Sequence, residues 1–219
     1  MQQYQLTFID LALRSNALRF GRFTLKSGRE SPYFFNAGLF SDGAAAATLG
    51  RCYAAAIMAA GLGFDMLFGP AYKGIPLATA TAIALSAEHR LSVPYAFNRK
   101  ETKEHGEGGR IIGAPLEGRV LIVDDVITAG TAVRESLGLI RAAGAQPVGV
   151  ALALDRQERG QGALSAVQEV QQAEGLRCVS IITLADLLEA LTQGPDRRAR
   201  ISDDQLTALR AYQQRYGVR

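Results

Sequence analysis

One stretch of the sequence determines the expected fold, and it reads Val120-Leu121-Ile122-Val123-Asp124-Asp125-Val126-Ile127-Thr128-Ala129-Gly130-Thr131-Ala132. An unbroken apolar strand ends in two adjacent carboxylates, and a short turn of small and hydroxyl residues then opens a helix. Continuous apolar strands are typical of parallel sheets that are covered on both faces. Because ligands of open α/β sheets bind beyond the carboxyl ends of the strands, the pattern predicts a binding site at this turn.

The residue types at the turn indicate the kind of ligand. Backbone N–H groups and the hydroxyls of Thr128 and Thr131 would meet at a helix N-terminus, which is a favourable place for an anion. Asp124 and Asp125 would repel a phosphate, so we expect them to face sugar hydroxyls instead. The pattern therefore predicts a phosphorylated sugar. The alternatives are a phospho-receiver domain, whose first strand would carry the acids and hold magnesium, and a plain loop with a capping threonine.

Apolar strands alternate with helical patterns on both sides of this stretch. We expect strands at 65–68, 93–97, 120–123, 146–154 and 178–183, and helices at 74–89, 131–143, 165–174 and 184–191. This alternation predicts an α/β fold with a parallel sheet flanked by helices. Between the second and third strands, residues 98–118 are expected to form a polar, glycine-containing loop with at most a marginal hairpin around Ile111-Ile112.

The N-terminal part has a different pattern. A helix is expected at 4–18, a hairpin of strands at 22–26 and 31–36, and a small-residue helix capped by Ser41-Asp42 that ends near 61–63. At the other end, Ser202 precedes two aspartates and would cap a last helix. With no linker or repeat, residues 1–219 are expected to form one domain, with a small hood at 1–40 and the α/β core at about 60–185.

Composition excludes several classes of protein. The 219 residues carry 24 Lys+Arg and 21 Asp+Glu, and 48% are hydrophobic, which excludes disorder, collagen and coiled coil. Cys52 and Cys178 do not make a disulfide framework and are expected to be reduced thiols. The N-terminus lacks a secretory pattern, and 44–62 is too weakly hydrophobic for a membrane span. We therefore expect a soluble, cytoplasmic protein that binds neither membrane nor nucleic acid.

Lysine is rare in this chain. Only four of the 24 cationic residues are lysines, and Lys100 and Lys103 share one polar loop, while the others are Lys26 and Lys73. A compact ammonium is one of the groups that bind phosphate. The alternative is that all four are scattered, solvated side chains.

The stretch from Val120 to Ala132 resembles the phosphoribosyl-pyrophosphate (PRPP) signature of the type I phosphoribosyltransferases. The whole chain is similar to the bacterial, orotate-using members of that family, as further matching positions indicate: Phe34-Phe35, Tyr72-Lys73, the loop from Arg99 to Gly106, and Arg156. The resemblance implies a type I phosphoribosyltransferase-like sheet beneath an N-terminal hood. It also implies transfer of the phosphoribosyl group of PRPP to orotate, giving orotidine 5′-monophosphate and pyrophosphate in pyrimidine (UMP) biosynthesis.

The resemblance also implies roles for individual residues. Catalytic roles fall on Lys73, Lys103, Asp124 and Asp125. PRPP binding falls on these four together with Lys26, Tyr72, Arg99, Lys100, His105 and the residues from Val126 to Ala132, namely Val126, Ile127, Thr128, Ala129, Gly130, Thr131 and Ala132. Orotate binding falls on Phe34, Phe35, Thr128 and Arg156. A guanidinium suits a carboxylate, and orotate differs from uracil by its carboxylate.

The resemblance further implies Mg²⁺ carried mainly by PRPP, without a protein metal cage, and a homodimer in which the 99–109 loop of one subunit covers the site of the other. Three rival functions remain open at this point. The first is a phosphoribosyltransferase for a purine or for uracil. The second is a PRPP-sensing regulator without catalysis, although no DNA-binding module is visible. The third is a nucleotide-binding scaffold, which would leave the cationic loop unexplained.

Overall fold

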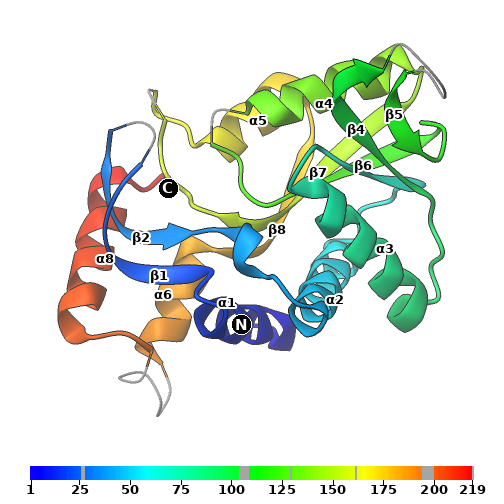
Figure 1. Ribbon diagram of the computed structural model, residues 1–219. Helices are drawn as coiled ribbons and strands as arrows, with labels where there is room; N and C mark the ends of the chain where they lie inside the picture. The colour runs from blue at the N-terminus through cyan, green and yellow to red at the C-terminus, as the bar shows by residue number, and fades with distance from the viewer. Residues whose placement is uncertain (26–27, 104–108, 129, 161, 194–199, 219) are drawn as a thin grey trace.

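A computed structural model of the chain describes residues 1–25, 28–103, 109–128, 130–160, 162–193 and 200–218, with the backbone alone at 102, 103 and 109. The described part contains a six-stranded sheet and a separate two-stranded sheet, with helices packed around them (Figure 1).

The six-stranded sheet has the strand order β5-β4-β3-β6-β7-β8. Its strands are β3 (Met66–Gly69), β4 (Tyr95–Lys103), β5 (Gly109–Gly113), β6 (Arg119–Asp124), β7 (Gln146–Asp155) and β8 (Arg177–Thr183). All neighbouring pairs are parallel except β4 and β5, which form an antiparallel hairpin at the edge. The predicted parallel sheet is thus confirmed, and an antiparallel edge strand is added to it.

Helices cover both faces of this sheet, as α/β architecture requires. Side chains of β6 alternate between two apolar clusters: Leu121 and Val123 belong to one, and Val120 and Ile122 to the other. The first cluster joins the sheet to α2 (Gly43–Ala60), α3 (Gly74–His89), α6 (Leu184–Thr192), α1 (Gln3–Arg14) and α8 (Asp203–Tyr216). The second packs under α4 (Thr131–Ala142) and α5 (Ala166–Glu174). Figure 1 shows these two helices on one side of the sheet.

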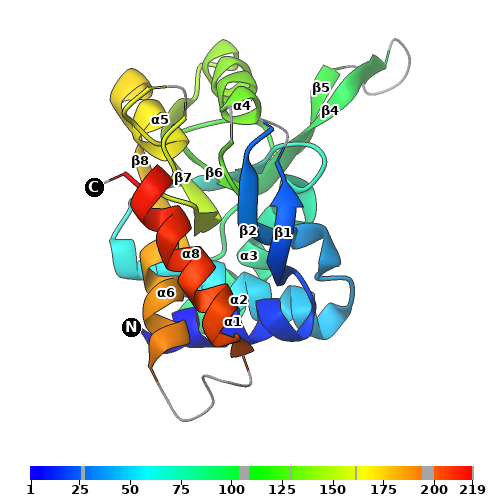
Figure 2. The same cartoon turned by 90° about the vertical axis from the view of Figure 1, so that its left-hand side faces the viewer.

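The two-stranded sheet forms a hood over the core. It pairs β1 (Leu18–Thr24) with β2 (Glu30–Phe35), and the 3₁₀ turn η1 (Ala37–Leu39) follows. Helix α8, from the other end of the chain, packs against β2 (Figure 2). Segments from the two ends of the chain therefore meet at the hood.

Helix α2 is long and apolar enough, by length and composition alone, to cross a membrane. Here it is a core helix, packed against α1, α3 and β8, and its residues Leu49, Tyr53 and Ile57 are buried. Cys52 lies on the same buried face and Cys178 is half-buried, and both are free thiols, as predicted. Burial raises the pKa of each thiol to about 12, so neither is a ready nucleophile.

Three boundaries differ from the sequence-based expectation. The first helix ends at Arg14 instead of residue 18, because Leu18 already pairs with Phe35 in the hood. The predicted strand at 93–97 begins at Tyr95 and runs to Lys103. Within 98–118, the expected hairpin around Ile111-Ile112 is present, since Asn98 pairs with Ile111, but the expectation of a loop over the rest was wrong for 98–103, which belong to β4. Polar residues are tolerated there because the hairpin is an exposed edge.

Candidate active site

The two acidic residues lie at the carboxyl end of β6, in the middle of the sheet. Asp124 and Asp125 are only 7% and 5% exposed. The hydroxyl of Tyr53, from α2, donates to the backbone oxygen of Asp124 at 2.7 Å. The backbone oxygen of Asp125 accepts from Ala153 of β7 at 2.9 Å. Bonds from both sides therefore fix the backbone that carries the carboxylates.

The two carboxylates have different surroundings. Asp125 forms an ion pair with Lys73, whose Nζ lies 2.7 Å from Oδ2, and it accepts the backbone N–H of Val126 at 2.9 Å. In the described part of the chain, Asp124 Oδ1 accepts the backbone N–H of Asp125. Burial, reinforced by the charge of Asp125, raises the pKa of Asp124 to about 7. A ligand that donates hydrogen bonds to Asp124 would therefore stabilise its charged form.

The predicted anion-binding turn leads into α4. Gly130 has φ +70° and immediately precedes the helix, and the side chains of Thr128 and Thr131 are exposed. A left-handed residue here lets the chain turn sharply from strand to helix, which favours glycine. The first N–H groups of the twelve-residue helix therefore begin at the sheet edge where the carboxylates lie. Ala129 lies outside the described residues.

Lys73 reaches this edge because α3 starts in direct contact with the sheet. A Cβ built on Gly74 would clash with the ring of Pro70 and lie 2.9 Å from the carbonyl oxygen of Val123. Only glycine lets the helix approach β6 so closely. The loop before it is held by Asn98, a buried residue whose Oδ1 accepts the N–H of Ala71 at 2.8 Å.

Lys100 of β4 also faces this loop. The Nζ of Lys100 lies 5.1 Å from the ring centroid of Tyr72, a cation–π contact between two exposed side chains. Arg99 is half-buried next to it. The structure thus places Lys100 of β4 against Tyr72, next to Lys73 at the start of α3, while Arg99, its neighbour in the strand, points to the other face. Lys26, His105 and the Lys103 side chain lie outside the described part of the chain.

The adjacent phenylalanines of β2, Phe34 and Phe35, point in opposite directions, as expected for neighbours in a strand. Phe35 is buried against Phe8 and Phe40. The ring of Phe34 is half-exposed and stacks on Phe23, with centroids 5.5 Å apart. One of the two rings is therefore available to line a ligand site.

Arg156 follows β7 and lies against the opposite side of β2 from Phe34. Its guanidinium covers the ring of Tyr33 at 4.2 Å, and Nη2 donates to Ser31 Oγ at 3.3 Å. It also pairs with Glu158, with Nη2 and Oε1 2.8 Å apart. The sequence reasoning assigned Arg156 and two residues of β2 to the orotate site without predicting this contact, and it did not identify Glu158 as a partner.

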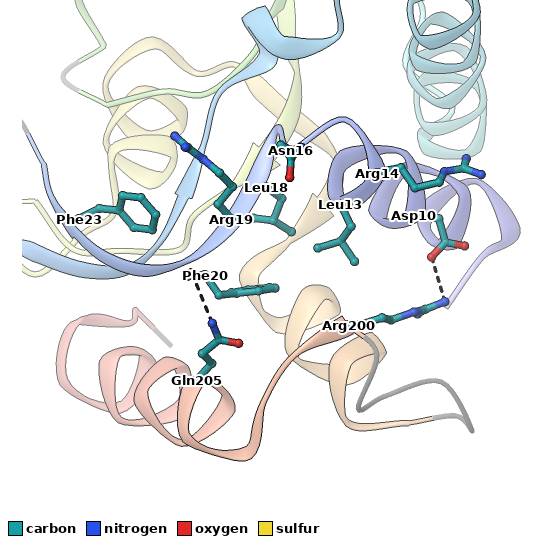
Figure 3. A pocket seen from close by; sticks show the side chains of 10 residues that line it. All are labelled: Asp10, Leu13, Arg14, Asn16, Leu18, Arg19, Phe20, Phe23, Arg200 and Gln205. Atoms are coloured by element: carbon teal, nitrogen blue, oxygen red, sulfur yellow. Dashed lines mark hydrogen bonds and ion pairs between the residues drawn. The ribbon is translucent and has the colours of Figure 1, made fainter.

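A cavity of about 740 Å³ lies elsewhere, between α1, β1 and the start of α8 (Figure 3). Arg19, Phe20 and Phe23 line it, and Arg200 pairs with Asp10 at its rim. None of its lining residues is a predicted site residue. We therefore place the candidate site at the strand ends rather than in this cavity. Among the described residues, no group of three or more His, Cys, Asp or Glu could hold a metal ion.

Comparisons with known proteins identify the family. A model of the phosphoribosyl transferase domain matches residues 40–174. Over 218 residues and the full length of both proteins, the chain is 61% identical to an orotate phosphoribosyltransferase of Thioalkalivibrio sulfidiphilus. The chain belongs to the orotate phosphoribosyltransferase family.

Solved structures of the family agree with this assignment. The crystal structure of an orotate phosphoribosyltransferase from Francisella tularensis matches with a TM-score of 0.84 at 40% identity, covering 96% of this chain and 98% of that one. A Mycobacterium tuberculosis family member in complex with PRPP matches with a TM-score of 0.62 at 27% identity, over 84% of this chain and 98% of that one. The predicted fold class is therefore confirmed. The comparisons do not assign single residues, so the roles given above remain predictions.

Proposed function

We propose that the protein transfers the phosphoribosyl group of PRPP to orotate, with release of pyrophosphate, as a step of pyrimidine nucleotide synthesis in the cytoplasm. The observation that carries the proposal is the meeting of Asp124, Asp125 and Lys73 at the turn that opens α4. Buried acids beside a helix N-terminus suit a ligand that combines hydroxyls with a phosphate. The full-length similarity to orotate phosphoribosyltransferases supports orotate as the base.

The proposed chemistry is a displacement at the anomeric carbon. Orotate N1 loses its proton, which the departing pyrophosphate can accept, and forms the new bond to the anomeric carbon as the bond to pyrophosphate breaks, through a transition state with oxocarbenium character. The protein's own groups then act by positioning and by electrostatics. The turn at 128–131 holds the 5′-phosphate, and the two carboxylates accept the ribose hydroxyls. The cations Lys73, Arg99, Lys100, Lys103 and His105 neutralise the departing pyrophosphate.

The proposed metal is Mg²⁺, bound mainly through PRPP oxygens. The oxygen-rich phosphates of PRPP suit this ion, so PRPP itself can supply most of its ligands while Asp124 and Asp125 accept the ribose hydroxyls. When bound, the ion would neutralise charge on the pyrophosphate.

The test of the proposal is a spectrophotometric assay. Purified protein given PRPP and Mg²⁺ should deplete the ultraviolet absorbance of orotate, and the same assay with uracil, hypoxanthine and adenine should show no comparable turnover. Turnover of another base but not of orotate would overturn the choice of base. Folded protein that binds PRPP without any turnover would support the regulator instead.

We further propose a homodimer with shared sites. Figure 2 shows the β4–β5 hairpin projecting from the body of the subunit, so the cations that follow Arg99 are carried outward. A twofold dimer would bring each hairpin over the partner's site. Lys103→Ala and Asp125→Asn proteins should each be nearly inactive, and mixing them should restore activity, because some dimers then contain one intact site. Verified subunit exchange without recovered activity would place the loop in its own chain's site.

A further inference from the structure

Glu158 is the centre of a buried polar network that the proposed function does not use. Its Oε1 accepts from the hydroxyl of Tyr33 at 2.9 Å and lies 2.8 Å from Arg156 Nη2. Its Oε2 accepts from the hydroxyl of Tyr212 at 3.0 Å and lies 3.7 Å from Arg29 Nη1. The side chain is only 9% exposed. Four groups from three separate parts of the chain therefore converge on one carboxylate.

This network fixes the guanidinium of Arg156 from two directions. Glu158 pairs with Nη2, and the guanidinium carbon lies 4.2 Å from the centre of the Tyr33 ring. Among the described residues, the hydrogen bonds and ion pair of Arg156 use Nη2, so the N–H groups at Nε and Nη1 remain for a ligand. The Arg156 side chain is 13% exposed.

A second carboxylate lies near this network. Burial raises the pKa of Asp155, and the nearby charge of Glu158 raises it further. The two guanidinium groups of Arg29 and Arg156 pair with Glu158 itself. Glu158 thus holds Arg156 in place through a direct ion pair.

The backbone around Glu158 is also tied to the C-terminal part of the chain. Glu158 forms an isolated β-bridge with Gly217, and Arg159 N–H donates to the carbonyl of Tyr216 at 2.9 Å. Gln157 has φ +50°, an uncommon conformation for a residue with a side chain. Its Oε1 accepts the N–H of Ala185, which helps to hold that conformation.

We propose that Glu158 is a positioning residue for Arg156, and that through Tyr212 it makes α8 part of the recognition of the orotate carboxylate. This inference rests on the proposed function. It predicts an effect on orotate that is separate from any effect on PRPP, because the network contacts neither Lys73 nor the described residues of the β6–α4 turn.

The test compares steady-state kinetics of matched variants with both substrates. Glu158→Gln keeps the size of the side chain but loses its charge and presents a donor on one side of the network. We expect its KM for orotate to rise roughly tenfold, the scale of one charged hydrogen bond, with kcat and the KM for PRPP changed by less than about twofold. Tyr212→Phe should raise the orotate KM by about two- to fivefold. Tyr216→Phe is the matched control, since its hydroxyl makes no contact with Glu158, and its kinetics should match the wild type.

A double variant separates positioning from general support of the fold. If Glu158 acts through Arg156, adding Glu158→Gln to Arg156→Ala should lower the orotate kcat/KM by less than about twofold further. Three results would each overturn the inference. They are additive losses of orotate kcat/KM in the double variant, equal losses of kcat/KM for orotate and PRPP in Glu158→Gln, and an unchanged orotate KM in Glu158→Gln. If Glu158→Gln fails to fold, the orotate KM of Tyr212→Phe is compared with that of Tyr216→Phe. A raised KM in Tyr212→Phe alone supports the inference, and equal KM values overturn it. Wild-type protein that does not consume orotate would instead overturn the proposed function.

Discussion

The unusual ionisation of Asp124 gives a stability prediction that can be measured without substrate. Its pKa in the folded protein is about 7, against an ordinary value of 3.8, because the carboxyl is buried beside Asp125. The folded state therefore binds the proton more tightly than the unfolded state. The resulting stabilisation is fully present below about pH 4 and is lost as the pH rises through about 7.

The magnitude follows from the two pKa values. They differ by about 3 pH units (7 − 3.8), and at about 1.4 kcal/mol per unit the wild type should lose about 4 kcal/mol from this group between pH 4 and pH 8. Asp124→Asn does not titrate, and its amide oxygen can still accept the N–H of Asp125. Relative to the wild type, the variant should therefore gain up to about 4 kcal/mol over this interval, or roughly 10 °C in Tm.

Thermal unfolding of both proteins at several pH values between 4 and 8 measures the effect. The gap in Tm should widen with rising pH, while the variant loses PRPP binding. Asp65→Asn is the contrasting control. Hydrogen bonds from Arg119 lower the pKa of the exposed Asp65 to about 2, so the charged carboxylate stabilises the fold above about pH 4. The Asp65→Asn variant should therefore be less stable than the wild type in that range. Parallel Tm curves for Asp124→Asn and the wild type would refute the reasoning.

Three further predictions concern the same strand ends. Gly74→Ala should lower the free energy of unfolding by about 2 kcal/mol or more in denaturant titrations, because the new Cβ meets Pro70 and the Val123 carbonyl. An unchanged free energy of unfolding would show that α3 can shift. Arg156→Ala should raise the dissociation constant of orotate about tenfold or more by calorimetry and spare that of PRPP, whereas matched losses would count against its role. Asp125→Asn should weaken PRPP binding more than it changes Tm, and loss of stability in proportion to activity would make it structural.

The sequence predicted the sheet and the turn because the signals there are local. The unbroken apolar run from Val120 to Val123 can be buried on both faces only in a covered parallel sheet, and the structure places it in the middle of one. The acids and Gly130 follow within a few residues, so their common position at one edge follows from strand geometry alone. The hood hairpin was predicted for the same reason, although Leu18 rather than residue 22 begins it.

The parts that were missed depend on distant contacts. The second half of β4, residues 98–103, is polar, and polar residues without alternation resemble a loop, so the sequence predicted at most a short hairpin around Ile111-Ile112. Glu158 and Tyr33 are 125 positions apart in the sequence, and no local pattern pairs them. Asn98 and Tyr53 likewise support the site through single hydrogen bonds to distant backbone atoms. Only the folded chain identifies such supporting residues.

The unequal layers on the two faces of the sheet have a consequence for the dynamics of the protein. The turn that opens α4 rests on the smaller apolar cluster, beneath α4 and α5, whereas Lys73 and the hood rest on the larger one. The layer with fewer buried side chains should open more often by local unfolding, so its amide protons should exchange first. A ligand that bridges the two layers stabilises the closed form by mass action. Occupancy of the site would therefore slow exchange most in the helix that carries the phosphate turn.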